Sequence, residues 1–528
     1  MPAEFSCEIA IIGAGAVGIA MAAELSRKGR DVILIEAGGA NLEVRSQDIF
    51  NNARSSGFKL EGLQSGRFRL LGGTTKFWGG QLVPFDPIVF EDRPWAHCEG
   101  WPFGRATLNS YYDRAMTMLK MDGGEATDAA VWARAGTRPP DLDGDLEMFL
   151  TRWIKTTNFA RHFQADLAGA KITTLLHANV CGFELNESRR RIEHIHLRCF
   201  GGRRGRVSAR HTILACGTIE IARLLLLPDV AGRSMPWSDN PWLGRGYLDH
   251  LDSTAGNVYP KDRKRFNDLF ENMFFDGYKY NPKIKLTEDA QRDHKLLGVA
   301  GSMIFKTSYA ENARNLKLFI KSILSGKLEP GFWTVPLHAI ALAKVALPLA
   351  YRYFRANRTF HPSSASILLR VTSEQVPLRE SRITLRHERD ALDMPMVDVH
   401  WAVDGSELNS IAYFAERVRD AMSTAGIADI RLDPALVARD PAYLATAEDT
   451  YHQMGGARMG RSAQDGVVDA NLAVHGVDGL SVAGAAVMPS SGFPNCTLTA
   501  IALGLRLCDH LTAGGYKAKM PLAESVTG

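Results

Sequence analysis

Three closely spaced glycines near the start of the chain have the spacing of a site that binds phosphate groups through the backbone. Gly13, Gly15 and Gly18 directly follow the apolar run 7–12. In such a pattern the first glycine permits a tight turn, the second lets a pyrophosphate approach the backbone, and the third lets a helix pack closely on a strand. The free N–H groups at the start of that helix face the phosphates. A glycine-rich loop without a ligand has the same local spacing, so the neighbouring elements decide between the two interpretations.

Those neighbouring elements occur in the order that a dinucleotide site requires. The stretch 19–29 has the apolar spacing of a helix and ends at a glycine, and a second apolar run, 31–35, leads to an acidic residue. An acid at this place accepts hydrogen bonds from ribose hydroxyls and repels a 2′-phosphate. The motif does not distinguish FAD from NAD. We predict a dinucleotide site that also includes Val17, Glu36 and Ala37.

A second glycine-rich loop, at 71–80, combines two threonines with one large aromatic residue. Such a loop can lie against a flat ring while hydroxyls and backbone N–H groups reach the polar edge of that ring. An ordinary tight turn around a buried tryptophan is the alternative. We expect cofactor contacts from Gly72, Gly73, Thr74, Thr75, Trp78 and Gly79.

The C-terminal part of the chain places one histidine in a distinctive context. His452 lies in the run YHQMGGARMG (451–460), and the segments 465–471, 474–489 and 495–502 follow. Oxidising an alcohol requires a group that removes the hydroxyl proton, and a neutral imidazole, with an ordinary pKa of about 6.5, suits that task. A single histidine without such a context is usually structural.

The order of these motifs resembles the glucose–methanol–choline (GMC) oxidoreductase family, and most closely its branch with pyranose 2-oxidase and bacterial sugar and gluconate dehydrogenases. Supporting segments are 212–217, 243–250, 374–375 and 381–385, whereas the likeness is faint between about 255 and 370. The resemblance implies FAD as cofactor, His452 as catalytic base and Asn495 as the second member of the catalytic pair. It also implies cofactor contacts from Val180, Ala215, Gly217, Gly484, Asn495 and Thr497, and structural or near-cofactor roles for His250 and His475.

Three residues depart from the family pattern. Gly484 stands where many members carry an Asp near the cofactor, and Cys496 stands where Pro is common. Phe77 occupies the position of a His through which some relatives attach FAD covalently. We therefore expect noncovalent FAD.

These motifs require elements from distant parts of the chain to meet. We predict an α/β fold in which a discontinuous, Rossmann-like FAD-binding domain is combined with an α+β substrate domain that contains an antiparallel sheet. The alternating pattern of 172–215 predicts a β-meander inserted into the doubly wound part. The expected segments are 1–90, 166–255 and 446–528 for the FAD-binding domain, 91–165 as a connecting or substrate-domain segment, and 256–445 for the substrate domain.

Composition limits the partners and the compartment. The 528 residues carry a net charge of +4, which is too small to indicate a nucleic-acid partner. The seven cysteines form no Cys-x-x-Cys pair, and no HExxH motif occurs, so no metal site is expected. No secretion signal precedes the first strand, and we expect a cytoplasmic protein.

The segment 311–360 fits this description least well. It is basic, and the largely apolar stretch 332–350 has Lys344 as its only formal charge. Two prolines, a histidine and this lysine argue against a membrane span. The alternatives are buried helices with a solvated basic face, or a surface that contacts the inner face of an anionic membrane or caps a lipophilic or anionic substrate.

The expected function is oxidation of an alcohol, a sugar or glycoside hydroxyl, to a carbonyl by an FAD-dependent enzyme. The electron acceptor, which is O₂, a quinone or another compound, does not follow from the sequence. The alternatives are an FAD-containing lyase, an oxidoreductase for a lipophilic membrane-associated alcohol, a protein that binds FAD only structurally, and a nicotinamide-dependent dehydrogenase.

Overall fold

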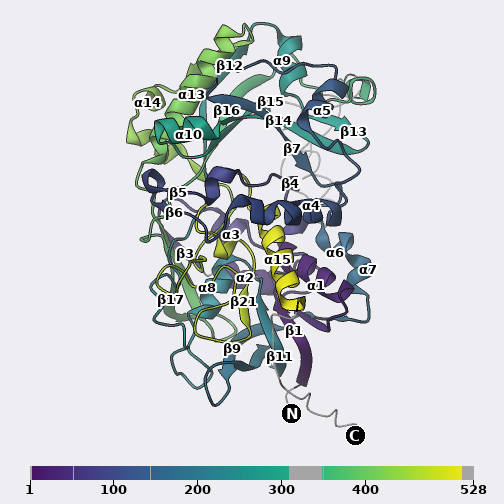
Figure 1. Cartoon of the computed structure of the whole chain (residues 1–528), viewed down its shortest axis with the longest axis vertical. Helices are drawn as coiled ribbons and strands as arrows, with labels where there is room; N and C mark the ends of the chain where they lie inside the picture. The colour runs from purple at the N-terminus through teal and green to yellow at the C-terminus, as the bar shows by residue number, and fades with distance from the viewer. Residues whose placement is uncertain (1–2, 52, 143, 308–347, 349, 514–528) are drawn as a thin grey trace, which may run out of the picture.

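Two large β-sheets follow one another along the long axis of the molecule (Figure 1). The computed structural model describes residues 3–51, 53–142, 144–307, 348 and 350–513. One sheet, with helices α1 and α15, occupies the lower half of the view, and the other, with helix α13, occupies the upper half. The site described below draws residues from both halves.

The lower sheet has seven strands in the order β8-β2-β1-β11-β10-β9, with β21 paired to β11. The pairs β1–β2, β2–β8, β1–β11 and β11–β21 are parallel, whereas β9, β10 and β11 form an antiparallel meander. The meander predicted over 172–215 is therefore shorter than expected, because the first strand of that range, β8, joins the parallel part of the sheet. The four apolar residues 9–12 at the end of β1 are fully buried, as is typical of a strand covered on both faces. Helices α1 and α15 pack against each other beside this sheet. The strands are β1 (Ala3–Ile12), β2 (Val32–Ile35), β8 (Ile172–Leu175), β9 (Asn179–Leu185), β10 (Ile192–Arg198), β11 (Arg204–Leu214) and β21 (Leu480–Val482).

The upper sheet has nine strands, its main order is β19-β12-β16-β15-β14-β7-β4, and the pairs within it are antiparallel. Helix α13 (Glu407–Thr424) covers one face. Along β14 every second residue is buried, so the strand has one core face and one partly exposed face. The strands are β4 (Gln81–Leu82), β7 (Leu146–Trp153), β12 (Leu251–Pro260), β13 (Met273–Phe275), β14 (Tyr278–Leu286), β15 (Val299–Lys306), β16 (Ser366–Ser373), β19 (Ala428–Leu432) and β20 (Glu448–Asp449).

Two smaller sheets and several helices complete the described fold. A three-stranded sheet is formed by β17 (Arg382–Arg389), β18 (Pro395–Trp401) and β3 (Arg54–Gly57), and a short pair by β5 (Asp92–Arg93) and β6 (Cys98–Glu99). The other helices are α1 (Ala16–Arg27), α2 (Val44–Asn51), α3 (Gly62–Ser65), α4 (Asn109–Met118), α5 (Asp128–Arg134), α6 (Phe159–His162), α7 (Gln164–Leu167), α8 (Thr218–Leu225), α9 (Arg263–Phe270), α10 (Glu288–His294), α14 (Pro434–Val437) and α15 (Thr497–Thr512). The 3₁₀ helices are η1 (Gly73–Lys76), η2 (Pro87–Phe90), η3 (Pro94–Ala96), η4 (Arg105–Leu108), η6 (Pro441–Thr446) and η7 (Ala485–Val487).

The predicted fold class is confirmed: a mixed α/β sheet of the dinucleotide-binding type is combined with a largely antiparallel sheet. The predicted segment boundaries remain a prediction. Most of 311–360 lies outside the described residues, and none of the described helices is both long and apolar enough to cross a membrane. All seven cysteines are unpaired.

Candidate active site

A cavity of about 640 Å³ extends from the first glycine loop to the C-terminal motif. Its size is typical of sites for cofactors and small ligands. Fifteen of the predicted cofactor residues line it, namely Gly13, Gly15, Val17, Glu36, Ala37, Gly73, Thr74, Thr75, Trp78, Gly79, Val180, Ala215, Gly217, Gly484 and Thr497. The predicted residues Gly18, Gly72 and Asn495 are not part of the lining.

Several glycines in this lining leave space that a ligand can occupy. A Cβ atom added at Gly15, Gly217 or Gly484 would meet nothing within 4 Å. Gly18 differs, since a Cβ there would lie 1.9 Å from the carbonyl oxygen of Gly13, so this glycine allows the helix to approach the loop. The open space at Gly15, at the start of α1, fits the pyrophosphate of a dinucleotide.

Glu36 connects the first glycine loop to the segment after β2. Its buried carboxylate accepts hydrogen bonds from the backbone N–H groups of Ala14, at 3.0 Å, and Gly38, at 2.8 Å. Burial raises the pKa of Glu36, and the two N–H groups oppose that shift. Because each carboxylate oxygen can accept more than one hydrogen bond, Glu36 retains acceptor capacity for a ribose.

The second glycine-rich loop is held against the first. The N–H of Gly72 donates to the carbonyl of Ala14 at 2.9 Å, and Gly72 has a φ of +94°, a conformation that favours glycine. Gly72 thus positions the loop without lining the cavity. The Thr75 hydroxyl accepts from the N–H of Phe159 at 3.1 Å, and the Trp78 indole donates to the carbonyl of Thr157 at 2.9 Å. These bonds fix the loop edge that faces the cavity.

Sequence reasoning missed the three cations in the lining, Arg223 and the neighbouring pair Arg67 and Arg69. Arg67 pairs with Glu220 at 3.3 Å, yet its Nη2 atom is buried without a hydrogen-bond partner among the described residues. Burial lowers the pKa of Arg67 to about 10. The position of Arg67 and Arg69 directly before the second glycine loop was a usable signal, because that loop was already expected at the cofactor.

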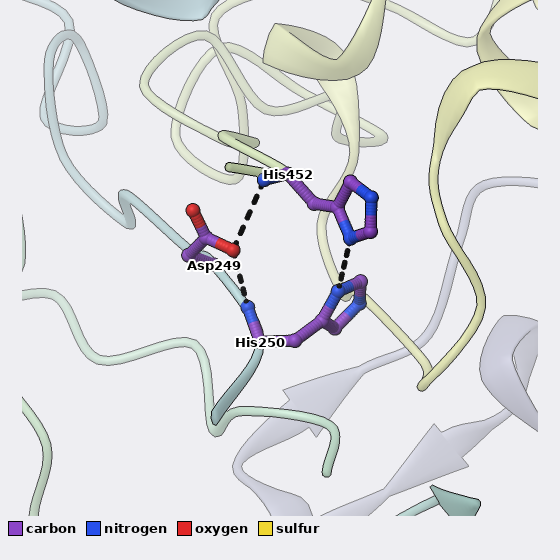
Figure 2. A group of neighbouring side chains, drawn as sticks. All are labelled: Asp249, His250 and His452. Carbon is purple, nitrogen blue, oxygen red and sulfur yellow. Dashed lines mark hydrogen bonds between the residues drawn. The ribbon is translucent and has the colours of Figure 1, made fainter. Parts of the chain in front are cut away.

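At the other end of the cavity, Asp249, His250 and His452 form a compact cluster (Figure 2). One carboxylate oxygen of Asp249, Oδ1, accepts from the backbone N–H of His250 at 2.7 Å and of His452 at 3.1 Å. Oδ1 also accepts from the Thr450 N–H, at 3.2 Å, and from the Thr450 hydroxyl, at 2.8 Å. Tyr451, between Thr450 and His452, has a φ of +65°, which is costly for a residue with a side chain. One buried acid thus holds the segment before β12 and the segment after β20 together.

The two imidazole rings face each other through their Nδ1 atoms, which lie 3.0 Å apart. The Nδ1 atom of His452 also lies 2.8 Å from the Thr450 hydroxyl oxygen. His452 lines the cavity and is partly exposed, whereas His250 is fully buried and its Nε2 atom has no partner among the described residues.

Burial and neighbouring charges shift the ionisation of this cluster. Burial lowers the pKa of His452 well below its usual value, and the ring of His250 and the Lys283 ammonium lower it further. Burial likewise lowers the pKa of His250 to about 4. Burial and then the Asp449 carboxylate raise the pKa of Asp249 to about 7. Both imidazoles are therefore neutral near pH 7.

Aspartate and histidine are also metal ligands, and one ligand atom from each of these three residues lies within 4.8 Å of the others. Asp249 Oδ1 and both Nδ1 atoms are, however, already engaged in hydrogen bonds. These hydrogen bonds can hold a proton at a fixed position between the side chains of the cluster.

Asn495 lies just before α15 and is buried outside the lining of the cavity. Its Nδ2 atom donates to the carbonyl of Gln81, and its Oδ1 atom is buried without a partner among the described residues. One N–H and the amide oxygen thus remain for a ligand. The following residues Cys496 and Thr497 do line the cavity.

Comparison with known families matches two parts of the chain. Residues 8–236 match the family "FAD dependent oxidoreductase", and residues 377–504 match the C-terminal domain of the family "GMC oxidoreductase". The first range contains the glycine loops and Glu36, and the second contains His452 and Asn495.

Individual relatives are distant, and some of them match most of the chain. It is 23% identical to 6‴-hydroxyparomomycin C oxidase of Streptomyces lividus, over 96% of this chain and 92% of that protein. The fructose dehydrogenase large subunit of Gluconobacter japonicus is 31% identical over 26% of this chain and 24% of its own length. The crystal structure of pyridoxine 4-oxidase from Mesorbium loti has the same fold, with a TM-score of 0.57 and 18% identity over 96% of this chain and 99% of that one.

The family matches and the cavity agree on the cofactor. The chain carries the C-terminal domain of the GMC oxidoreductase family at residues 377–504, and it is an FAD-dependent enzyme of the GMC type that acts on alcohol (CH–OH) donors.

Proposed function

We propose that the enzyme oxidises a hydroxyl of a sugar or glycoside to a carbonyl, with His452 as the base that removes the hydroxyl proton. The single observation that supports this role best is the hydrogen-bonded series from Asp249 through Thr450 to the Nδ1 atom of His452, at the wall of the cavity. The names of the relatives, an aminoglycoside oxidase and a fructose dehydrogenase, support a sugar as substrate class.

The series determines which nitrogen of His452 acts. Thr450 has a single hydroxyl proton, which it donates to Asp249, so the Thr450 oxygen can only accept from the imidazole. The Nδ1 atom of His452 therefore carries the ring proton, and His250 Nδ1, at 3.0 Å, acts as a second acceptor. In a neutral ring the lone pair is then on Nε2, which is the atom that accepts the substrate proton.

The lowered pKa of His452 keeps this lone pair available. Because burial and two neighbouring groups disfavour the imidazolium, His452 is ready to accept a proton at neutral pH. The fixed Thr450 and Asp249 partners hold the ring in place while the proton is transferred. Asn495, with a free amide oxygen and a free N–H, orients the reacting hydroxyl.

The glycine loops, Glu36 and the loop 72–79 would hold FAD, because their open space and backbone donors match a dinucleotide and a flat ring. Bound FAD supplies the acceptor for the hydride that leaves the alcohol carbon. We expect noncovalent attachment, since the side chain at position 77 is a phenylalanine. The electron acceptor, a cytoplasmic location and a peripheral membrane contact remain predictions.

The visible spectrum of the purified holoenzyme tests this proposal. In the absence of oxygen, a sugar or glycoside from a panel that also contains simple alcohols should bleach the flavin absorbance. The His452→Ala variant should retain its flavin and fail to bleach with the same compound. A flavin that only simple alcohols reduce would contradict the substrate class, and a His452→Ala variant that bleaches at the normal rate would contradict the role of the base.

A further inference from the structure

We propose that the substrate carries an anionic group, a carboxylate or a phosphate, which is bound by Lys283 with support from Lys279. This inference rests on the proposed oxidation of a sugar hydroxyl and specifies its substrate class. It is based on the face of the upper sheet that is opposite to α13.

The strand register identifies this face. Gly301 pairs with Ile284, and a Cβ atom at Gly301 would lie 2.8 Å from the Phe414 ring of α13, so Ile284 is on the helix-covered face. Because side chains alternate along a strand, Lys283 projects to the opposite face. Its partner in the register is Phe149.

This opposite face is close to the segment that contains Asn495. The rings of Phe149 and Phe493 are 5.7 Å apart, and Phe493 lies two residues before Asn495. Lys283 also lies close enough to His250 and His452 to lower the pKa of both rings. A substrate hydroxyl at His452 and an anionic substituent at Lys283 can therefore belong to one sugar-sized molecule.

The cations of this face are paired unequally. Lys285 bonds to Asp86 and to Glu147, both at 2.8 Å, and Arg370 bonds to Asp252 at 2.8 Å and to Glu448 at 2.7 Å. Within the described part of the chain, Lys283 and Lys279 have no carboxylate partner. The ammonium of Lys279 lies 3.5 Å from the centre of the Trp153 ring.

The absence of a carboxylate in ion-pair contact with Lys283 is energetically costly at this place. Burial lowers the pKa of Lys283, and Asp252, whose charge Arg370 already neutralises, is the group that opposes this. Burial lowers the pKa of Lys279 as well, and the charge of Lys283 adds to the shift. Two poorly hydrated ammonium groups that repel each other are stabilised by an anion bound beside them.

The same charges disfavour a polycationic substrate. Lysine is a compact point charge, which suits a carboxylate or a phosphate equally.

A matched series of sugars tests the inference with the holoenzyme. The compounds share one sugar ring and carry at C6 a hydroxyl, a carboxylate, a phosphate or an amine. We expect the rate of anaerobic flavin reduction per unit concentration to be at least about tenfold higher with an anionic member than with the amine. In Lys283→Gln this preference should disappear through a higher KM for the anion, whereas Lys283→Arg should retain most of it.

Lys285→Gln is the matched control, because this lysine lies on the same strand and face but has carboxylate partners, and it should keep the preference. Calorimetric binding of acetate and of inorganic phosphate gives a readout without turnover, and it should weaken in Lys283→Gln and not in Lys285→Gln. An unchanged preference and unchanged anion binding in Lys283→Gln would overturn the inference. If no sugar reduces the wild-type flavin, the proposed function fails, while the anion titration still decides the role of Lys283.

Discussion

The two ends of the cavity are built in different ways. At the nucleotide end, the chain contributes mainly backbone: glycines that leave space, N–H groups at the start of α1, and one carboxylate, Glu36, that ties two loops together. At the catalytic end, it contributes side chains from segments far apart in the sequence, including Asp249, Thr450 and His452. Lys283, in β14 of the same upper sheet as β12 and β20, lowers the pKa of His452.

This difference indicates how each end tolerates change. A backbone site depends on the absence of atoms, so an added side chain damages it without disturbing the rest of the fold. A side-chain site depends on hydrogen bonds in a fixed direction, so the removal of single atoms damages it while the cofactor stays bound.

The strongest test of this comparison is removal of the base. We expect His452→Gln to slow flavin reduction by the substrate about 10²–10⁴-fold, because proton removal then depends on water. The FAD content should not change. Stopped-flow absorbance measures the rate, and His294→Gln, a half-exposed histidine of α10, serves as control. A decrease in the rate of flavin reduction smaller than tenfold would contradict the role of His452 as the base.

The nucleotide end should respond to an added side chain. Gly15→Val introduces a side chain into open space, so the fold should persist while the affinity for FAD falls at least about tenfold. The flavin-to-protein absorbance ratio after dialysis, with circular dichroism for the fold, measures this. Gly201→Val, at an exposed turn with equally open space, should retain FAD. Full flavin content in Gly15→Val would contradict the position assigned to the pyrophosphate.

A smaller effect is expected from the residue that orients the base. Thr450→Val preserves the shape of the side chain but removes the acceptor for the His452 Nδ1 proton. Flavin reduction should slow about tenfold, in line with about one net hydrogen bond. Thr450→Ser should restore most of the rate. Equal rates in the valine and serine variants would show that the hydroxyl does not act on the ring.

The smallest expected effect concerns pH. Since burial, His250 and Lys283 lower the pKa of His452, the neutral base persists into mildly acidic solution, and the rate falls only as the pH decreases through that lowered pKa. Removing the positive charge in Lys283→Gln raises the pKa of His452. The acid limb of the rate with a neutral sugar should therefore move to higher pH by up to about one unit. A shift to lower pH would contradict the proximity of the two groups.

The sequence was sufficient to predict the nucleotide end, because its parts are neighbours along the chain. The strand, the glycine loop, the helix and Glu36 lie within residues 3–36, and each has a local signature. The predicted FAD and the α/β architecture with an antiparallel sheet are confirmed.

The catalytic end was predicted only in part. His452 was identified through its motif, but its roles and those of Asn495 remain predictions. Thr450 and Asp249 were not singled out, and His250 was assigned a structural or near-cofactor role. Their relation depends on how the segments before β12 and after β20 are brought together, which no local pattern encodes. The position of Lys283 likewise depends on the register of β14 with β7.

The order of the strands has a consequence for biosynthesis. Strand β1 lies inside the lower sheet, and the cavity begins at the end of this strand. Residues around 484–500, which are synthesised much later, form another wall of the same cavity. At typical translation speeds, an interval on the order of tens of seconds separates the synthesis of these two walls. A nascent chain therefore presents its phosphate loop long before it can enclose a flavin. Complete enclosure of the cofactor therefore requires the C-terminal segment and can only follow its synthesis.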